Sequence, residues 1–503
     1  MVSRKLTIAI MLALLVGGGL LGAFVLLSPQ KYQCGPQSMV QSTQLTPVQF
    51  GAVTKYQLPP DRSPNGIVAA PDGSVWFGEL GAPGVAHLYP GNGTLVEYRW
   101  PFDYKSASGA PTGCFDWTDT WGVAIWNGTI WAPNQDNSSL VGLNPSNDTF
   151  QTVRLNSTSQ PYTLALGPDN TLWFTDLSYP ARIGSVDAST HQVTYYNLPS
   201  GSQSVSAYML FENSTLGYVL SIYPDTGGGS LYSFDPTASN PSFALVGGNE
   251  TVPQSRPSSK VSTGVGGGPS TPTSVTVGEG GIWLAEHSGS DMEFYNESAM
   301  RWELYPTSVV GYVPWTLPYF DVSTGSAVWF NEHYGNRLAE ICCNASALTE
   351  YSLSNPPVEN ITKIDNSLTI AAAGSRVWFT EWTAGYVGFV DTTYRPSFSV
   401  SLNSSSTIEM RPGTTATAQM ELSGESSRSL ILQFSDSEQT SATPQDISFT
   451  SSVQTLSSLN GEQSVAVTIS AAEAIRPGQY SALMTVTDGL ISRSVYLTID
   501  IAT

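Results

Sequence analysis

Short apolar stretches rich in β-branched and aromatic residues recur along the chain between turn residues, and this pattern predicts a protein built from strands. The clearest stretch reads β-branched residue, Trp, aromatic or small residue, any residue, acid. It occurs at residues 75–79, 172–176, 282–286, 328–332 and 377–381, with a weaker copy at 130–134 and a degenerate one at 218–221. An apolar strand and a turn such as Pro71-Asp72-Gly73 precede it, and two further strands follow. One unit is therefore expected to be a four-stranded sheet.

The spacing of these units indicates the fold class. Neighbouring copies lie 42 to 65 residues apart, which is typical of propeller blades. Seven units predict an all-β protein with a seven-bladed β-propeller over residues 31–395, in which the Trp residues pack between blades. The last unit lacks its closing strand, and a matching segment, residues 53–59, stands alone before the first unit. We expect this segment to complete the last blade and close the ring.

After Arg395 the pattern changes, because Trp disappears and Ser and Thr alternate with Val, Ile and Leu. Residues 397–402, 415–422 and 464–469 alternate with a period of two, as half-buried strands of a sandwich do. Residues 477–488 look like the last hairpin of immunoglobulin-like modules in bacterial and archaeal surface proteins. Residues 396–503 are therefore predicted to form an Ig-like β-sandwich that serves as a spacer or contact module.

The first thirty residues carry a membrane signal. Arg4 and Lys5 precede an uncharged run, residues 6–27, which at about 1.5 Å per residue is just long enough to span a hydrocarbon core. Basic residues on the short N-terminal side keep that end in the cytoplasm, so the bulk of the chain is expected to be extracytoplasmic. Residues 1–30 are predicted to be a single-pass transmembrane helix at the cell membrane. A cleaved signal peptide, which would make the protein secreted, is the alternative.

Composition narrows the partners and the compartment. Forty acidic against twenty basic residues give a net charge of -20, which repels phosphate backbones and argues against nucleic acid as a partner. Export permits disulfides, and the four cysteines allow three pairings. They are Cys34, Cys114, Cys342 and Cys343. We expect structural disulfides in which the two adjacent cysteines hold different partners; a metal-thiolate site is the alternative, without support from a C-x-x-C spacing.

Sequons of the N-x-S/T type are dense, as in a glycosylated surface protein. They stand at Asn92, Asn127, Asn137, Asn147, Asn156, Asn213, Asn249, Asn296, Asn344, Asn360 and Asn403. A second interpretation stays open, because the Asn-Gly pairs at residues 92–93 and 127–128 are also what a type I′ hairpin turn requires.

The repeat, read as Pro-x-x-Ile/Leu, a turn, Trp-Phe-x-Glu and a closing Glu-Tyr-x-Leu-Pro, resembles the virginiamycin B lyase (streptogramin lyase) family over residues 54–391. The resemblance implies a seven-bladed propeller. Family members with lyase activity open a lactone by elimination, using Mg²⁺ and a set of His and Glu residues. Their critical histidines stand in Pro-His-Gly or Pro-His-Ala at the start of two late blades. Here those positions read Pro64-Asn65-Gly66, Pro161-Tyr162-Thr163, Pro272-Thr273-Ser274 and Pro314-Trp315-Thr316, with Leu368 in the last unit. None holds a histidine, so imidazole acid-base catalysis from them is excluded.

In contrast to the histidines, an acid is present after most of the Trp strands. These acids are Glu79, Asp176, Glu286, Glu332 and Glu381, with Asn134 and Ser221 in the two odd units. If the register holds, they occupy equivalent places around the axis, where oxygen ligands could bind Mg²⁺ or Ca²⁺ or recognise sugar hydroxyls. The alternative is that each carboxylate accepts hydrogen bonds within its own blade.

Two histidines directly follow such acids, in the pairs Glu286-His287 and Glu332-His333. Neighbours in a strand point to opposite faces, so each pair can share a pocket only if its strand ends there. In that case the four residues are candidate acid-base or metal-binding groups near the axis; surface or loop histidines are the alternative.

Together these patterns predict a membrane-anchored extracytoplasmic propeller that binds a small-molecule, glycan or protein ligand on its axial face. An enzyme is the alternative, in the form of a carbon-oxygen lyase or lactone-cleaving hydrolase that uses a divalent metal at the axial carboxylates. A structural role in a surface coat is the third possibility.

Overall fold

The computed structural model is built almost entirely from strands, with one 3-10 turn, η1 (Pro168–Asn170), among the residues it describes. Those residues are 40–80, 84–100, 120–135, 137–187, 189–223, 228–247, 271–287, 289–311, 316–360, 363–403, 405–436 and 446–502. The predicted transmembrane helix, Cys34, Cys114 and Asn249 lie outside them. Within the described ranges, no helix is long and apolar enough to cross a membrane.

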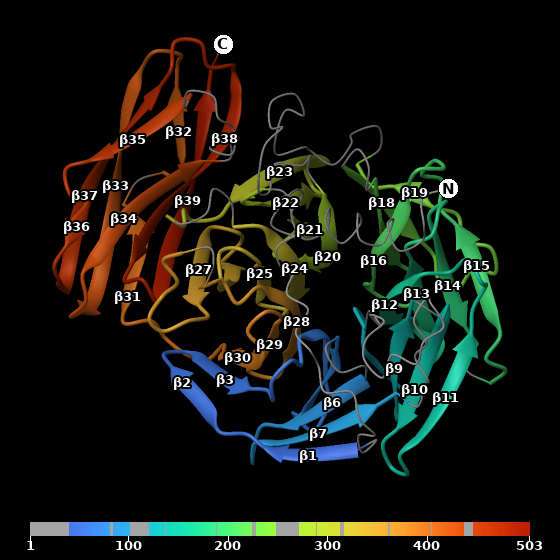
Figure 1. The fold of residues 1–503 in the computed structure, drawn as a ribbon. Coiled ribbons are helices and arrows are strands. Elements are labelled where there is room, and N and C mark those ends of the chain that lie inside the picture. Colours follow the sequence, from blue (N-terminus) through green and yellow to red (C-terminus); the bar gives the residue numbers. More distant parts are fainter. Residues whose placement is uncertain are drawn as a thin grey trace.

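Antiparallel sheets stand side by side around a common axis and form a β-propeller (Figure 1). The first sheet contains β4 (Pro64–Ala69), β5 (Val75–Glu79), β6 (Gly84–Tyr89) and β7 (Thr94–Arg99), with β1 (Val40–Gln44) added outside β7. Next come β8 (Ala124–Trp126), β9 (Thr129–Asn134), β10 (Ser139–Asn144) and β11 (Thr149–Arg154), and then β12 (Pro161–Leu166), β13 (Leu172–Asp176), β14 (Arg182–Val186) and β15 (Val193–Asn197). In each sheet the strands run from the axis outward in chain order, because short hairpins join them.

The ring continues with the same order in the later sheets. One contains β16 (Val205–Phe211), β17 (Gly217–Ile222), β18 (Gly229–Phe234) and β19 (Ala244–Leu245), and the next β20 (Pro272–Gly278), β21 (Gly281–Glu286), β22 (Asp291–Asn296) and β23 (Arg301–Pro306). The following sheet contains β24 (Pro318–Ser323), β25 (Ala327–Glu332), β26 (Arg337–Cys342) and β27 (Ala347–Ser352). The last contains β28 (Ser367–Ala373), β29 (Arg376–Glu381) and β30 (Tyr386–Asp391), extended by β3 (Val53–Gln57) and β2 (Pro47–Phe50).

The Trp of each repeat packs between neighbouring sheets, as the sequence predicts. Trp76, Trp131, Trp173, Trp283, Trp329 and Trp378 are at most 3% exposed. Each meets apolar residues of the following sheet, for example Trp76 with Ile130 and Ala132. Large rings buried in this way hold adjacent sheets together through hydrophobic contact area rather than through hydrogen bonds.

The ring is closed by the N-terminal strand. β3 pairs antiparallel with β30, with Val53 opposite Val390 and Gln57 opposite Tyr386. The prediction that residues 53–59 complete the last sheet is therefore confirmed over β3. Because strands from both ends of the ring share one sheet, the seam has no unpaired edge.

The remaining strands form two sheets packed face to face. One contains β31 (Phe398–Leu402), β33 (Thr415–Ser426), β37 (Leu459–Ala471) and β35 (Ile447–Ser451). The other contains β39 (Ile491–Ile501), β38 (Gly478–Thr487), β34 (Leu430–Asp436) and β36 (Thr455–Leu456), with β32 (Thr407–Met410) parallel to β39. Apolar side chains of both sheets, such as Met420 and Leu497, share one core.

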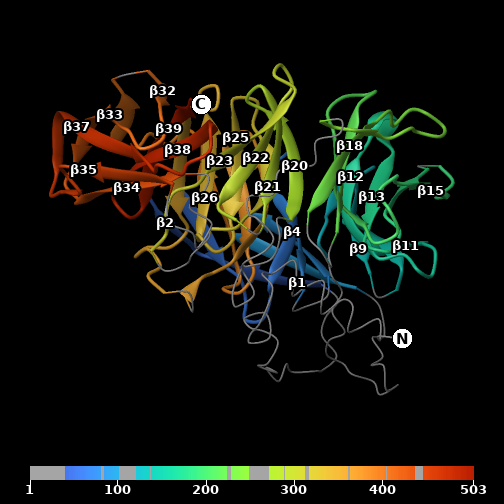
Figure 2. The same cartoon turned by 90° about the horizontal axis from the view of Figure 1, so that it is seen from above.

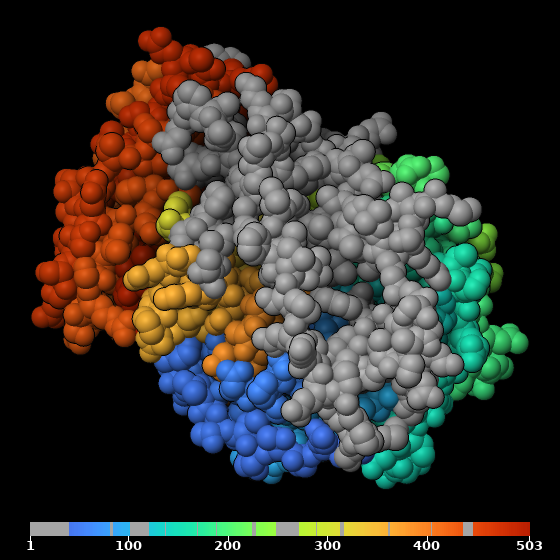
Figure 3. Space-filling model, in the orientation of Figure 1, coloured from blue at the N-terminus to red at the C-terminus, as the bar shows by residue number. Residues whose placement is uncertain are grey.

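This sandwich stands beside the ring rather than over its axial face (Figure 2). β39 pairs with β27, the outer strand of a propeller sheet, from Ala347 opposite Val495 to Tyr351 opposite Ile491. Leu483 of β38 belongs to the same apolar cluster as Leu348 of β27. In the space-filling view the orange and red sandwich lies directly against the gold propeller sheet (Figure 3). One continuous sheet therefore joins the two parts.

Candidate functional site

The acid that ends the second strand of a propeller sheet lies opposite the first residue of the innermost strand. The pairs are Glu79 with Pro64, Asp176 with Pro161, Glu286 with Pro272, Glu332 with Pro318 and Glu381 with Ser367. In the sheet of β16 to β19, Ser221 takes the place of the acid and lies opposite Ser206, the second residue of β16. Directly after each pair the register shifts, because the innermost strand carries one extra residue. The acids therefore occupy equivalent places around the axis, as the sequence predicts.

The residue after each of these positions of the innermost strand is placed at the bulge. These residues are Asn65, Tyr162, Ala207, Thr273, Tyr319 and Leu368. In the sheet of β8 to β11 the pairing begins at Ala124, and Trp121 stands just before it in the chain. Trp121, Tyr162, Ala207, Tyr319 and Leu368 belong to one buried cluster that draws residues from every sheet of the ring, and we call these five residues the axial cluster.

One alignment from the sequence needs correction. β24 begins at Pro318, and Pro318 rather than Pro314 lies opposite Glu332. Pro314 and Trp315 lie outside the described residues, and the position aligned with the histidine of the lyase family is occupied here by Tyr319. The sequence contains prolines at both places, and only the pairing with β25 distinguishes them. The conclusion that none of these positions is a histidine is unchanged.

The two histidines that follow acids meet beside the axial cluster. β21 ends at Glu286 and β25 ends at Glu332, so His287 and His333 are released from the alternation of the strand. Their ring centroids are 5.7 Å apart, and both lie near the ring of Tyr319, at 4.8 Å and 5.5 Å. The sequence predicts that each acid and its histidine can share a pocket only if the strand ends there, and both strands do end there. We call His287 and His333 the axial histidine pair.

Hydrogen bonding leaves part of each imidazole free. The Nδ1 atom of His333 lies 2.9 Å from the carbonyl oxygen of Ser367. A carbonyl only accepts, so Nδ1 carries the proton, and in the neutral ring Nε2 holds a lone pair. The Nε2 atoms of His287 and His333 are both buried and have no hydrogen-bond partner among the described residues. Next to them, the hydroxyls of Tyr319 and Tyr162 are 3.5 Å apart.

Burial also fixes the charge of the pair. It lowers the pKa of His333 to about 4 and the pKa of His287 well below its ordinary value of 6.5, with His333 lowering the latter further. Both rings are therefore neutral at pH 7. Neutral imidazoles accept hydrogen bonds or bind metals, whereas a pKa far below the operating pH is unfavourable for acid-base catalysis.

Four of the five acids are bound within their own sheets, whereas both carboxylate oxygens of Glu332 are buried without a hydrogen-bond partner among the described residues. The contacts are Glu79 with Arg99 (3.4 Å), Asp176 with Arg182 (2.9 Å), Glu381 with Lys55 (2.5 Å), and Glu286 with the backbone N–H of Thr271 (3.0 Å). Burial and the neighbouring Glu350 raise the pKa of Glu332, and Arg337 opposes that rise. The described part of the chain contains no group of three or more His, Cys, Asp or Glu side chains placed to share a metal ion. Metal binding by these acids stays a prediction.

The cysteines are only partly within the described residues. Cys342 ends β26 and is half-buried, and Cys343 is exposed in the turn that follows. Because Cys34 and Cys114 lie outside the described residues, the disulfides and their pairing also stay predictions.

The sequon asparagines that the structure describes lie at the surface, and several of them shape turns. Asn147 accepts hydrogen bonds from the backbone N–H (3.2 Å) and the hydroxyl (2.7 Å) of Thr149, between β10 and β11. Asp391, the last residue of β30, accepts the same two bonds from Thr393 at 2.9 Å and 2.6 Å in the turn that leads to β31. The pattern N/D-x-S/T therefore belongs to the turns that follow strands, whichever residues carry sugar.

Comparison with known proteins first defines a class. No protein-family model and no curated protein matches the chain. Among solved structures, a streptogramin B lyase is 21% identical with a TM-score of 0.50, over 67% of this chain and 97% of that one. This similarity shows the fold: the chain is a β-propeller.

Two further structures are similar at lower scores. Virginiamycin B lyase from Staphylococcus aureus, solved as a catalytically inactive variant with quinupristin, is 17% identical with a TM-score of 0.49, over 67% of this chain and 98% of that one. The extracellular domain of a hybrid two-component system protein from B. thetaiotaomicron is 11% identical with a TM-score of 0.44, over 88% of this chain and 56% of that one.

The sequence missed part of the site. It singled out His287 and His333 but not their aromatic neighbour Tyr319. The reason is that Pro314 also fits the proline position of the repeat, and that alignment leaves Tyr319 out. It also missed Trp121, whose strand has no leading proline; the signal that finds it is its distance of ten residues from Trp131, close to the eleven between Asn65 and Trp76.

Proposed function

We propose that this chain is an extracytoplasmic β-propeller that binds a ligand at the axial histidine pair. The observation that carries the proposal is the meeting of two neutral, buried imidazoles whose Nε2 atoms have no partner among the described residues. A buried polar atom without a partner costs free energy, and such atoms are characteristic of sites that a ligand or ordered solvent completes.

The surroundings define the chemistry of the ligand. The Nε2 lone pair of His333 favours a molecule that donates a hydrogen bond through a hydroxyl, and Nε2 of His287 offers a second polar atom beside it. Trp121 and Tyr162, with ring centroids 5.4 Å apart, and Tyr319 place buried aromatic side chains beside the axial histidine pair. A glycan combines hydroxyl donors with apolar C–H faces, so an oligosaccharide is the ligand class we propose over other small molecules or a protein.

The architecture we propose follows the sequence. Residues 31–395 form a seven-bladed propeller and residues 396–503 an Ig-like sandwich. Residues 1–30 anchor the protein in the cell membrane, or are cleaved to release it. The disulfides and the sugars on the sequons suit an oxidising, extracytoplasmic location.

The test is binding of a panel of oligosaccharides to the purified full-length protein by isothermal titration calorimetry. We expect at least one to bind, and the double change His287→Ala and His333→Ala to weaken it at least tenfold. His191 is exposed and far along the chain from the pair, so His191→Asn is the matched control and should bind normally. Absence of binding across the panel, or binding that the double change leaves intact, would contradict the proposal.

The second candidate function is a divalent-metal-dependent lyase or lactone-cleaving enzyme that uses Mg²⁺ or Ca²⁺ at the axial carboxylates. One observation favours a metal: His333 donates Nδ1–H to a backbone carbonyl, which is how metal-binding histidines are commonly oriented. The intrasheet bonds of the acids and the low pKa of the histidines speak against the reaction. Quinupristin incubated with the protein and Mg²⁺ should therefore keep its chromatographic retention time; ring opening would establish the enzyme instead.

A further inference from the structure

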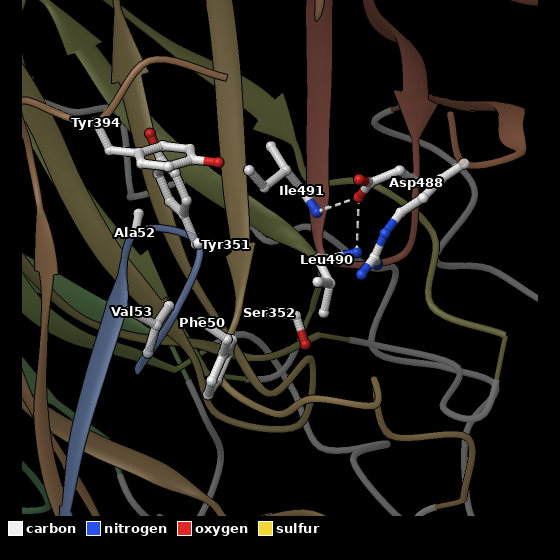
Figure 4. Close-up of a pocket in the computed structure, with 11 residues that line it drawn as sticks. Phe50, Ala52, Val53, Tyr351, Ser352, Tyr394, Asp488, Leu490 and Ile491 are labelled. Atoms are coloured by element: carbon white, nitrogen blue, oxygen red, sulfur yellow. Dashed lines mark hydrogen bonds between the residues drawn. The ribbon is translucent and has the colours of Figure 1, made fainter. Parts of the chain in front are cut away.

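A pocket lies at the place where the propeller ring closes and the sandwich joins it (Figure 4). Its volume is about 210 Å³, and we call it the junction pocket. Phe50 comes from the N-terminal strand pair, Tyr351 from β27, Tyr394 from the segment after β30, and Asp488 and Leu490 from the hairpin between β38 and β39. With Arg428, from the turn between β33 and β34, five distant parts of the chain build it.

Backbone hydrogen bonds fix the walls of the junction pocket. The N–H of Ser352 donates to the carbonyl of Leu490 at 2.8 Å, and the N–H of Asp391 donates to the carbonyl of Ala52 at 2.9 Å. Asp488 holds its own hairpin, because its Oδ1 accepts the N–H groups of Leu490 and Ile491 at 2.9 Å and 2.8 Å. The pocket is therefore formed before any ligand arrives, which reduces the entropic cost of binding.

The lining combines both charges with aromatic surface. Arg428, an exposed residue, and Asp488 line the same pocket, and among the described residues no ion pair within 4.0 Å joins them. The second carboxylate oxygen of Asp488 is not used by the hairpin N–H groups. Phe50 and Tyr394 add an aromatic wall. The pocket thus offers a cation, an anion and an apolar surface within a small volume.

We propose that the junction pocket binds a small zwitterion, a free α-amino acid with an apolar side chain. Its carboxylate pairs with the guanidinium of Arg428, which suits a planar bidentate contact. Its ammonium pairs with Asp488, and its side chain lies against Phe50 and Tyr394. The volume is below the roughly 300–1,000 Å³ of sites for drug-sized ligands, so the occupant is a small molecule. This site is separate from the axial histidine pair and does not depend on the proposed function.

The test is calorimetric titration of the full-length protein with L-leucine and L-phenylalanine. We expect a Kd of about 1 mM or tighter. N-acetyl-L-leucine lacks the ammonium and L-leucinamide lacks the carboxylate, and each should bind at least tenfold more weakly. Arg428→Ala should weaken L-leucine at least tenfold, while Arg411→Ala, another exposed arginine of the sandwich, should not. Asp488→Asn keeps an oxygen for the hairpin N–H groups and should also weaken binding tenfold.

Two results would overturn the proposal. One is the absence of heat and of thermal stabilisation with either amino acid at about 100 times the expected Kd, where a bound ligand must stabilise the folded state. The other is binding that Arg428→Ala and the blocked ligands leave unchanged. Substituting His287 and His333 should not affect amino-acid binding. A failure of the junction-pocket proposal can therefore be distinguished from a failure of the proposed axial site.

Discussion

At the scale of single residues, turn chemistry explains much of the density of sequons. Asn147 in the hairpin between β10 and β11 and Asp391 in the turn after β30 accept the same two hydrogen bonds, and Asp187 between β14 and β15 accepts them from Ser189 at 3.0 Å and 2.7 Å. A side-chain oxygen two residues before Ser or Thr is what the turn needs, and Asn and Asp supply it equally. The sequence alone showed the asparagines but could not show that aspartates share their place.

A pair of substitutions separates the turn from the sugar. Asn147→Ala removes the acceptor and should lower the free energy of unfolding by about 1 kcal/mol, the ordinary value of such a bond. Asn147→Asp keeps the acceptor and removes the sequon, so its stability should match the wild type in urea unfolding of the protein made without glycosylation. Equal losses in both variants would show that the side-chain oxygen does not hold the hairpin.

The axial histidines should make stability depend on pH. His333 has a pKa of about 4 when folded and 6.5 as its ordinary value, so the unfolded chain binds the extra proton first as pH falls. Stability is therefore lost between pH 6.5 and 4, by up to about 1.4 kcal/mol per pH unit for one histidine. In guanidinium unfolding at pH 7.5 and 5, His333→Gln should lose less stability on acidification than the wild type.

The control for this pH effect is His191→Asn, an exposed position that should keep the wild-type dependence. If His333→Gln also keeps it, the ring of His333 is protonated in the folded protein and the account of the pair is wrong.

At the scale of elements, the sequence predicted the strands that a local pattern determines. It missed the strand boundaries and pairings that depend on distant parts of the chain. The Trp strands and the closing segment β3 follow from period and spacing, since each repeat buries the same faces. The start of β24 at Pro318 and the pairing of β27 with β39 depend on partners far away in the chain. Nothing in the local sequence around Pro314 or Ile491 predicts this strand boundary or this pairing.

The closing strand also carries a buried charge that joins sheets. Lys55 of β3 contacts Glu381 at 2.5 Å and donates a 2.7 Å hydrogen bond to the carbonyl of Leu353 in the neighbouring sheet. Lys55→Met leaves Glu381 buried without its cation and should destabilise the protein by about 3 kcal/mol in chemical unfolding. Adding Glu381→Leu should restore most of this loss. If the double variant is as unstable as the single one, the ion pair is not what holds the seam.

At the scale of the whole molecule, the sandwich is part of the propeller's packing rather than a module on a flexible linker. β39 continues the sheet of β27, and Tyr496 and Leu483 share an apolar cluster with Leu348. The sequence shows a change of composition after Arg395, but composition does not show which faces two parts bury against each other.

Removing the sandwich should therefore damage the propeller. A chain of residues 40–395 exposes the edge of β27 together with apolar side chains that Leu483 and Tyr496 cover. We expect it to melt at a lower temperature than the full chain and to self-associate in light scattering. A monomer with an unchanged melting temperature would show that the shared sheet contributes little to stability.

The most direct test of the central claim is ¹⁵N NMR of the histidine side chains, with and without the tightest oligosaccharide from the binding panel. The chain has four histidines, so each signal can be assigned by single substitution. Without ligand, His287 and His333 should show neutral rings at pH 7, and with ligand their Nε2 signals should shift while those of His87 and His191 stay in place. Unchanged signals from His287 and His333 in the saturated complex would contradict ligand binding at the axial pair.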